Sequence, residues 1–263
     1  MNVSDRTIIG NIRTTFTALG IKAPADVARA FDEADRLAEG AARLTAEPGA
    51  VERTITAAIL GDRDPMTDPD VQRALTMQAL AGNVMLADTI SGAAIERLRD
   101  ACMAEHDTIV TAWAKVYDKE SGTLTRAHQQ IGDHDLTDTT PILAKGGDIA
   151  DVWAEAQDAV RVLDTVLTGW VNLMQFMRVS LTPDHRPLKV AALTYEQLSS
   201  MSPKLTPWDA VRAGLTPSLP TLEQYRQRVT AIQRGQSQHE ASQVPVDRER
   251  EANKAWAAKV GAR

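Results

Sequence analysis

The sequence contains a single cysteine, Cys102, among its 263 residues. One thiol cannot form an intramolecular disulfide, and it cannot supply the several sulfur ligands of a zinc cluster. Aromatic side chains make up only 4% of the chain, whereas apolar residues as a whole make up 43%. Because β-sandwiches depend on aromatic and β-branched side chains, a core of Ala, Leu, Val, Ile and Met favours helices packed on helices.

Long apolar runs are also missing. The longest strongly apolar, uncharged stretch, residues 165–177, has 13 residues, and a membrane-spanning helix needs about 20. The first six residues lack the basic-then-apolar pattern of a secretory signal peptide. The sequence therefore predicts a cytoplasmic protein that does not enter a membrane.

Proline is absent from residues 70–140 and 142–182, whereas seven of the twelve prolines lie from Pro183 onward. Since proline interrupts helix interiors, the centre can form long helices and the last third is divided into short ones. The predicted fold class is all-α: a helical bundle with long antiparallel, coiled-coil-like central helices and a proline-broken C-terminal tail. We expect three segments: an N-terminal three-helix segment (1–62), a central long-helix bundle (63–182) and a short-helix, basic tail (183–263).

Apolar residues spaced by three and four positions predict the individual helices. Three amphipathic helices are expected before residue 62, and the third carries an apolar stripe of Val51, Ile55 and Ile59. Asp68 and Pro69 then form a helix start. The helical pattern continues to about residue 118, with Gly82 and Gly92 as candidate breaks. Its second half keeps a heptad stripe in which one residue is ionisable: Ile95, Leu98, Cys102, Glu105, Ile109, Ala112 and Val116.

The most regular pattern follows Asp148, which is the expected helix cap. Nine apolar residues alternate steps of three and four, as in a helical-bundle or coiled-coil interface; they are Ile149, Val152, Ala156, Ala159, Leu163, Val166, Trp170, Leu173 and Met177. After Pro183 we expect a short helix over 207–213. A capping box at Thr221 and Gln224 predicts another helix to about residue 234, then a polar segment to 246 and a charged helix to 260.

Histidines and carboxylates gather near a polar loop over 132–147, and these are His128, Asp133, His134, Asp135 and Asp138. Nitrogen and oxygen ligands can hold a transition metal, but the spacing matches no helical histidine pair and no calcium loop. The alternative interpretation is a solvated acidic turn, and no metal or cofactor is assigned. No nucleophile or phosphate-binding motif occurs either, so no catalytic residue is assigned.

Charge is distributed unevenly along the chain, whose net charge is −6. The expected segments carry −2, −8 and +4 in order, so the tail is basic and could meet an acidic surface. Acidic residues interleave with its basic ones, which leaves three interpretations: a solvated helix with internal ion pairs, a docking segment for an acidic protein, or a nucleic-acid contact. The candidate interaction residues are Arg226, Arg228, Arg234, Arg248, Arg250, Lys254 and Trp256.

These features predict a non-enzymatic structural, assembly or protein-interaction protein, homo-oligomeric through its central helices. Viral scaffolding factors and helical adaptors share this layout, although no residue motif supports that analogy. The Ala- and Arg-rich composition also suggests a bacterial or bacteriophage origin. One alternative is a helical-bundle enzyme or ligand binder with an unrecognised pocket. Another is a DNA-binding regulator, which would need a basic recognition helix, whereas residues 25–46 carry more acid than base.

Overall fold

The computed structural model describes residues 3–43, 47, 49–139 and 147–260, with the backbone alone for residues 3–4, 41–43, 84, 87, 147–148, 183 and 243–260. The described chain is helical and has no β-strand, which confirms the predicted all-α class. Its elements are α1 (Val3–Ala18), α2 (Ala25–Arg43), α3 (Ala50–Leu60), α4 (Pro69–Ala81), α5 (Val84–Ala104), α6 (His106–Ile131), α8 (Gly147–Phe176), η1 (Pro183–Lys189), α9 (Tyr195–Ser200), α10 (Pro207–Arg212) and α11 (Leu222–Val260).

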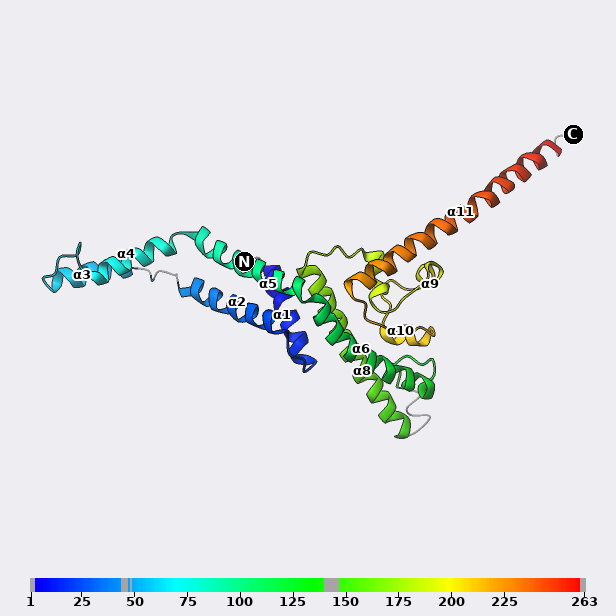
Figure 1. Ribbon diagram of the computed structural model, residues 1–263, viewed down its shortest axis with the longest axis horizontal. Coiled ribbons are helices and arrows are strands. Elements are labelled where there is room, and N and C mark those ends of the chain that lie inside the picture. The colour runs from blue at the N-terminus through cyan, green and yellow to red at the C-terminus, as the bar shows by residue number, and fades with distance from the viewer. Residues whose placement is uncertain (1–2, 44–46, 48, 140–146, 261–263) are drawn as a thin grey trace.

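Helix α8 packs with α6 and α1, whereas α2–α5 and α3–α4 form separate helix pairs (Figure 1). Helix α6 lies along α8, and α1 covers another side of α8. Helix α2 packs on α5, whereas α3 packs on α4 and projects with it as an arm. The predicted boundaries at residues 62 and 182 stay a prediction, although α1 and α2 both contact helices of the expected central segment.

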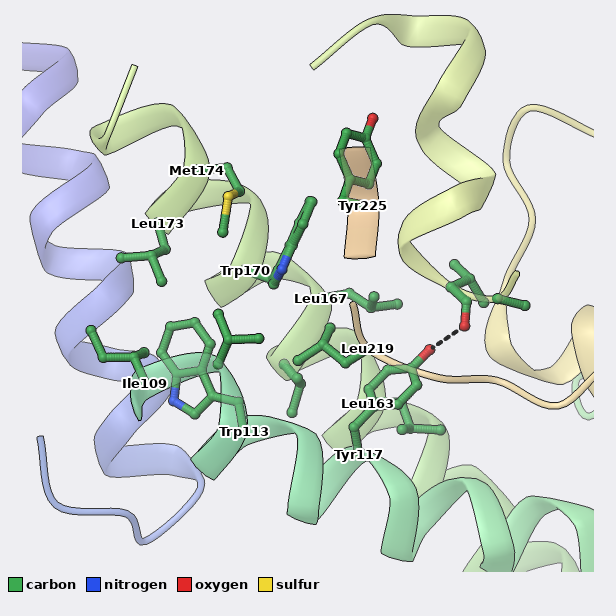
Figure 2. Packing of buried hydrophobic residues seen from close by; sticks show 14 of the residues in the cluster. Ile109, Trp113, Tyr117, Leu163, Leu167, Trp170, Leu173, Met174, Leu219 and Tyr225 are labelled. Atoms are coloured by element: carbon green, nitrogen blue, oxygen red, sulfur yellow. Dashed lines mark hydrogen bonds between the residues drawn. The ribbon is translucent and has the colours of Figure 1, made fainter. Parts of the chain in front are cut away.

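The regular stripe on α8 forms the centre of the core. Seven of its nine predicted positions are buried, and Ile149 and Val152 are partly exposed. Trp170 and Leu163 are fully inaccessible, and they lie in the same core cluster as Trp113 and Tyr117 of α6 (Figure 2). A helical bundle is therefore confirmed, and coiled-coil pairing stays a prediction.

Glu105 interrupts the heptad stripe, because α5 ends at Ala104 and α6 begins at His106. The expected helical stretch to about residue 118 is therefore divided among three helices, α4, α5 and α6. The break at Gly82 is confirmed, since α4 ends at Ala81, whereas Gly92 lies inside α5. We call the α5–α6 junction the elbow. His106 Nδ1 donates a hydrogen bond across the elbow to the Met103 carbonyl, at 2.8 Å.

The C-terminal prediction is partly wrong. The capping box is present, because Gln224 N–H donates to Thr221 Oγ1 at 3.2 Å and Thr221 N–H donates to Gln224 Oε1 at 2.9 Å. However, α11 runs without the expected polar break from Leu222 to Val260. Gly235 lies inside α11 and does not end it. The glycine allows Tyr195 to pack against the helix, since a Cβ at position 235 would lie 2.8 Å from Tyr195 Cβ.

None of the described helices is both long and apolar enough to cross a lipid bilayer.

Cys102 offers a direct test of the core. Its side chain is fully buried, and burial raises the pKa of the thiol to about 12. Because the thiolate is the reactive form, we expect a disulfide reagent such as Ellman's to label native protein only as fast as the core opens. Absorbance at the reagent's product band measures the rate. Labelling of the native protein as fast as of denatured protein would contradict this burial.

Candidate protein-binding surfaces

The histidine and carboxylate side chains near the 132–139 loop, which were considered as metal ligands, form hydrogen bonds with neighbouring protein groups instead. His128 Nε2 lies 2.8 Å from Asp133 Oδ1, and this bond lowers the pKa of Asp133. Asp135 Oδ1 accepts from the backbone N–H and the hydroxyl of Thr137, both at 2.8 Å. Within the described part of the chain, no group of three or more histidine, cysteine or carboxylate side chains could hold a metal ion. The structure therefore brings His128 and Asp133 together but does not assemble His134, Asp135 and Asp138 around them.

Tryptophan side chains fasten this loop to the bundle. The Trp153 indole donates to the Leu136 carbonyl at 3.0 Å, and the Trp208 indole donates to the His134 carbonyl at 3.0 Å. Gln157 adds a second bond to the Leu136 carbonyl, at 2.9 Å. The loop thus connects α6, α8 and α10, which is a structural role.

The candidate basic residues of α11 have different environments. Arg226 and Arg234 are exposed. Arg228 points inward and donates to the Leu188 carbonyl at 2.6 Å and to Ser218 Oγ at 2.8 Å, so it attaches α11 to the preceding segments. The side chains of the other four candidates lie outside the described residues, and they are Arg248, Arg250, Lys254 and Trp256.

A groove of about 760 Å³ lies beside the elbow, and we call it the elbow groove. It is bounded by the elbow, by the end of α8 with the segment after it, and by the start of α11. Its lining comprises Met103, His106, Met177, Arg178, Val179, Ser180, Thr182, His185, Leu222, Tyr225, Arg226, Val229, Thr230 and Gln233.

The elbow groove combines apolar surface with positive charge. Its cationic side chains are Arg178 and Arg226, and two histidines accompany them. No aspartate or glutamate is among its lining residues, although the chain as a whole is acidic. Met103 exposes 51% of its surface there. Opposite charges across an interface favour association and select partners, so the groove suits an apolar group that carries negative charge.

One wall of the elbow groove, at the end of α8, is held in place by contacts with α5. Buried Arg99 donates through Nε to the Phe176 carbonyl at 2.8 Å, and its guanidinium lies 5.2 Å from the Phe176 ring centroid. Glu96 pairs with both Arg99 and Arg178, and hydrogen bonding from Arg99 is the main cause of its lowered pKa. These contacts attach the end of α8 to α5.

The opposite wall rests on Trp170. Its indole donates to the Pro220 carbonyl at 2.9 Å, and its ring centroid lies 5.3 Å from that of Tyr225 (Figure 2). Tyr225 is buried, which raises the pKa of its hydroxyl. These contacts hold the α11 wall of the groove in place.

A second surface lies at the end of the α3–α4 arm (Figure 1). Ile59, Leu60 and Met66 expose 61%, 82% and 80% of their surface, and we call these three residues the arm tip. Leu75, Leu80 and Met85 add exposed apolar surface along the arm and at the start of α5. Among the described side chains, the other large exposed hydrophobic residue is Met103, which lines the elbow groove.

The turn that carries the arm tip is well fastened. The buried Asp68 side chain accepts hydrogen bonds from Asp70 N–H at 2.8 Å and Val71 N–H at 3.2 Å, and it pairs with Arg63. Asp64 Oδ1 accepts from Met66 N–H at 2.9 Å. Met66 is therefore held outward by an ordered turn.

Both surfaces were missed by the sequence analysis. Ile59 was expected to belong to a buried stripe, and this prediction is wrong because α3 packs mainly on α4, which leaves Ile59 exposed. The signal for the arm tip was present, since Leu60 and Met66 flank a turn that contains Gly61 and Pro65. The elbow groove has no such signal, because its lining comes from separate parts of the chain.

Comparisons with protein-family models, with curated protein sequences and with solved structures give no match, so functional inference rests on this chain's own residues.

Proposed function

We propose that this chain is a non-enzymatic assembly protein that self-associates through its α3–α4 arm. The observation that supports this is the concentration of exposed large apolar side chains between residues 59 and 85. Grouped exposed hydrophobic residues mark interaction surfaces on soluble proteins. Full burial of a Leu, Ile or Met side chain contributes roughly 1.5–3 kcal/mol, so covering the arm tip would favour a complex substantially.

The arm suits this role better than the α8 stripe does. The α8 stripe is covered by α1 and α6 of the same chain, so it has little surface left for a second copy. Within the expected central segment, the start of α5 and the outer side of α4 still expose Met85, Leu75 and Leu80. Self-association through the central helices therefore remains a proposal that involves α4 and α5, together with α3.

Substitution of the arm tip tests the proposed function. We expect the wild-type protein to show a mass that rises with concentration above the 28.6 kDa of one chain, measured by light scattering coupled to size exclusion. The variant Leu60→Ser/Met66→Ser removes two exposed apolar groups and should weaken association at least tenfold.

Gln129→Ser is the control, because it also introduces serine at an exposed position, on α6 away from the arm, but removes no apolar side chain. Circular dichroism should give all three proteins the same melting temperature. A wild-type mass of one chain at every concentration would refute the proposed function.

One observation favours the ligand-binder alternative. A pocket of about 210 Å³ is lined by Arg186 and Lys189 of η1 and by the rings of Trp170 and Tyr225. Burial lowers the pKa of Lys189. Two cations beside aromatic walls would suit a small carboxylate, and such a ligand is compatible with an assembly role.

A further inference from the structure

We infer that the arm tip of one copy docks in the elbow groove of another copy, so that the chains associate head to tail. This inference rests on the proposed function and names the surface that receives the arm. It follows from the chemistry of the two surfaces and from their separation on the molecule.

The arm tip carries negative charge around its apolar side chains. Asp62 and Asp64 are exposed in the turn beside Leu60 and Met66. The one cation of this turn, Arg63, is paired with the buried Asp68 carboxylate, which offsets its charge. A partner surface therefore meets apolar side chains flanked by uncompensated carboxylates.

The elbow groove has the complementary properties. It is concave, it exposes Met103, and its lining includes the exposed cation Arg226 and no acidic residue, while its second cation, Arg178, is paired with Glu96. Its volume of about 760 Å³ is within the roughly 300–1,000 Å³ of protein sites that enclose a compact group. Apolar contact would supply the affinity, and the charges would orient the tip in the groove.

The two surfaces are far apart within one chain. Figure 1 shows the arm ending at one extreme of the molecule, whereas the end of α8 and the start of α11 meet near the middle. The contact is therefore between copies. Because it joins two different surfaces, an open chain of copies keeps one free tip at one end and one free groove at the other, unless the chain closes into a ring.

The test uses two variants that each lose one surface. The tip variant, Leu60→Ser/Met66→Ser, keeps an intact groove. The groove variant, Met103→Glu/Arg226→Glu, keeps an intact tip and places acidic groups opposite the acidic turn. Both substituted groove positions are exposed, so the fold should persist, and circular dichroism checks this.

Each variant alone should associate at least tenfold more weakly than the wild type by light scattering. Mixed in equal amounts, the two variants should form a dimer of twice 28.6 kDa and nothing larger. The intact tip of the groove variant occupies the intact groove of the tip variant, and the dimer then has no intact surface left for a third copy. A symmetric arm-to-arm contact predicts a different result: the groove variant would associate like the wild type, and mixing would not recruit the tip variant. That result would overturn the inference and leave the proposed function standing, whereas a monomeric wild type would overturn both.

A single position gives an independent test that needs no groove substitution. In a cationic groove, Leu60→Glu should be tolerated better than Leu60→Lys, by about tenfold in the association constant. If two acidic arms met each other, the order would be reversed. Equal effects of the two substitutions would contradict docking in the elbow groove.

Discussion

Replacing Trp170 with alanine is expected to lower the free energy of unfolding by about 3–5 kcal/mol. The side chain is fully buried in α8, and it contacts the Tyr225 ring and the Pro220 carbonyl (Figure 2). Alanine would leave a large cavity and an unpaired buried carbonyl, and both destabilise the folded state. Since domains of this kind are stable by about 5–15 kcal/mol in total, urea unfolding followed by circular dichroism should show the loss clearly.

Two further substitutions separate the causes of this effect. Trp170→Phe keeps an aromatic ring but removes the indole N–H, so it should cost less than the alanine change, about 1–3 kcal/mol. Trp208→Ala is a second control, since Trp208 is also buried and hydrogen-bonded but lies on α10 beside the 132–139 loop. Both tryptophan-to-alanine changes should destabilise the fold, whereas Trp170→Ala should also weaken assembly at temperatures where the protein is still folded. A loss below about 1 kcal/mol for Trp170→Ala would show that this side chain does not anchor α11.

The α8 core could be predicted from sequence because its signal is local. A residue on one side of a helix recurs every three or four positions, whatever the helix contacts. The buried positions from Ala156 to Met177 follow this rule. The same rule gave the all-α class; on α8 it failed at the start of the stripe, where Ile149 and Val152 are partly exposed, and on α3 it failed at Ile59.

The break at Glu105 could not be read from the same pattern. The apolar residues of α5 and α6 keep the heptad spacing across the elbow, yet α5 packs on α2 and α6 packs on α8. Because the two helices pack on different neighbours, their axes point in different directions. The spacing of apolar residues does not reveal the direction of a helix axis. Glu105 is half-buried at the junction.

The candidate surfaces show the limits of charge patterns. Arg226 and Arg228 stand two positions apart and were given the same role, but one lines the elbow groove and the other donates to backbone carbonyls inside the protein. A two-residue step on a helix turns the side chain to a different face. Which face meets the rest of the chain depends on the path of residues 183–221, and this path is set by tertiary contacts.

Gly169→Ala is expected to destabilise the protein by about 1–3 kcal/mol, although alanine favours helices. Gly169 lies in the middle of α8, where α1 approaches closely: an added Cβ would lie 2.4 Å from Thr15 Cγ2 and 2.6 Å from Thr15 Oγ1. Thr15 has little freedom to move, because it is buried and its hydroxyl donates to the Asn11 carbonyl at 2.9 Å. The added methyl group would therefore push α1 away from α8.

The matched control for Gly169 has the opposite expected sign. Gly122 also lies inside a long helix, α6, but a Cβ there would meet nothing within 4 Å. Gly122→Ala should therefore stabilise the protein by about 0.5–1 kcal/mol, whereas Gly169→Ala destabilises it in the same urea titration. Thr15→Ala should partly rescue Gly169→Ala, since it removes the two nearest atoms. The close approach at Gly169 also explains why the polar residue Asn172 is buried and bonded to Asn11 at 3.3 Å. Because Gly169 has no side chain, α1 packs closely on this face of α8 and buries Asn172, although an asparagine is usually exposed to solvent.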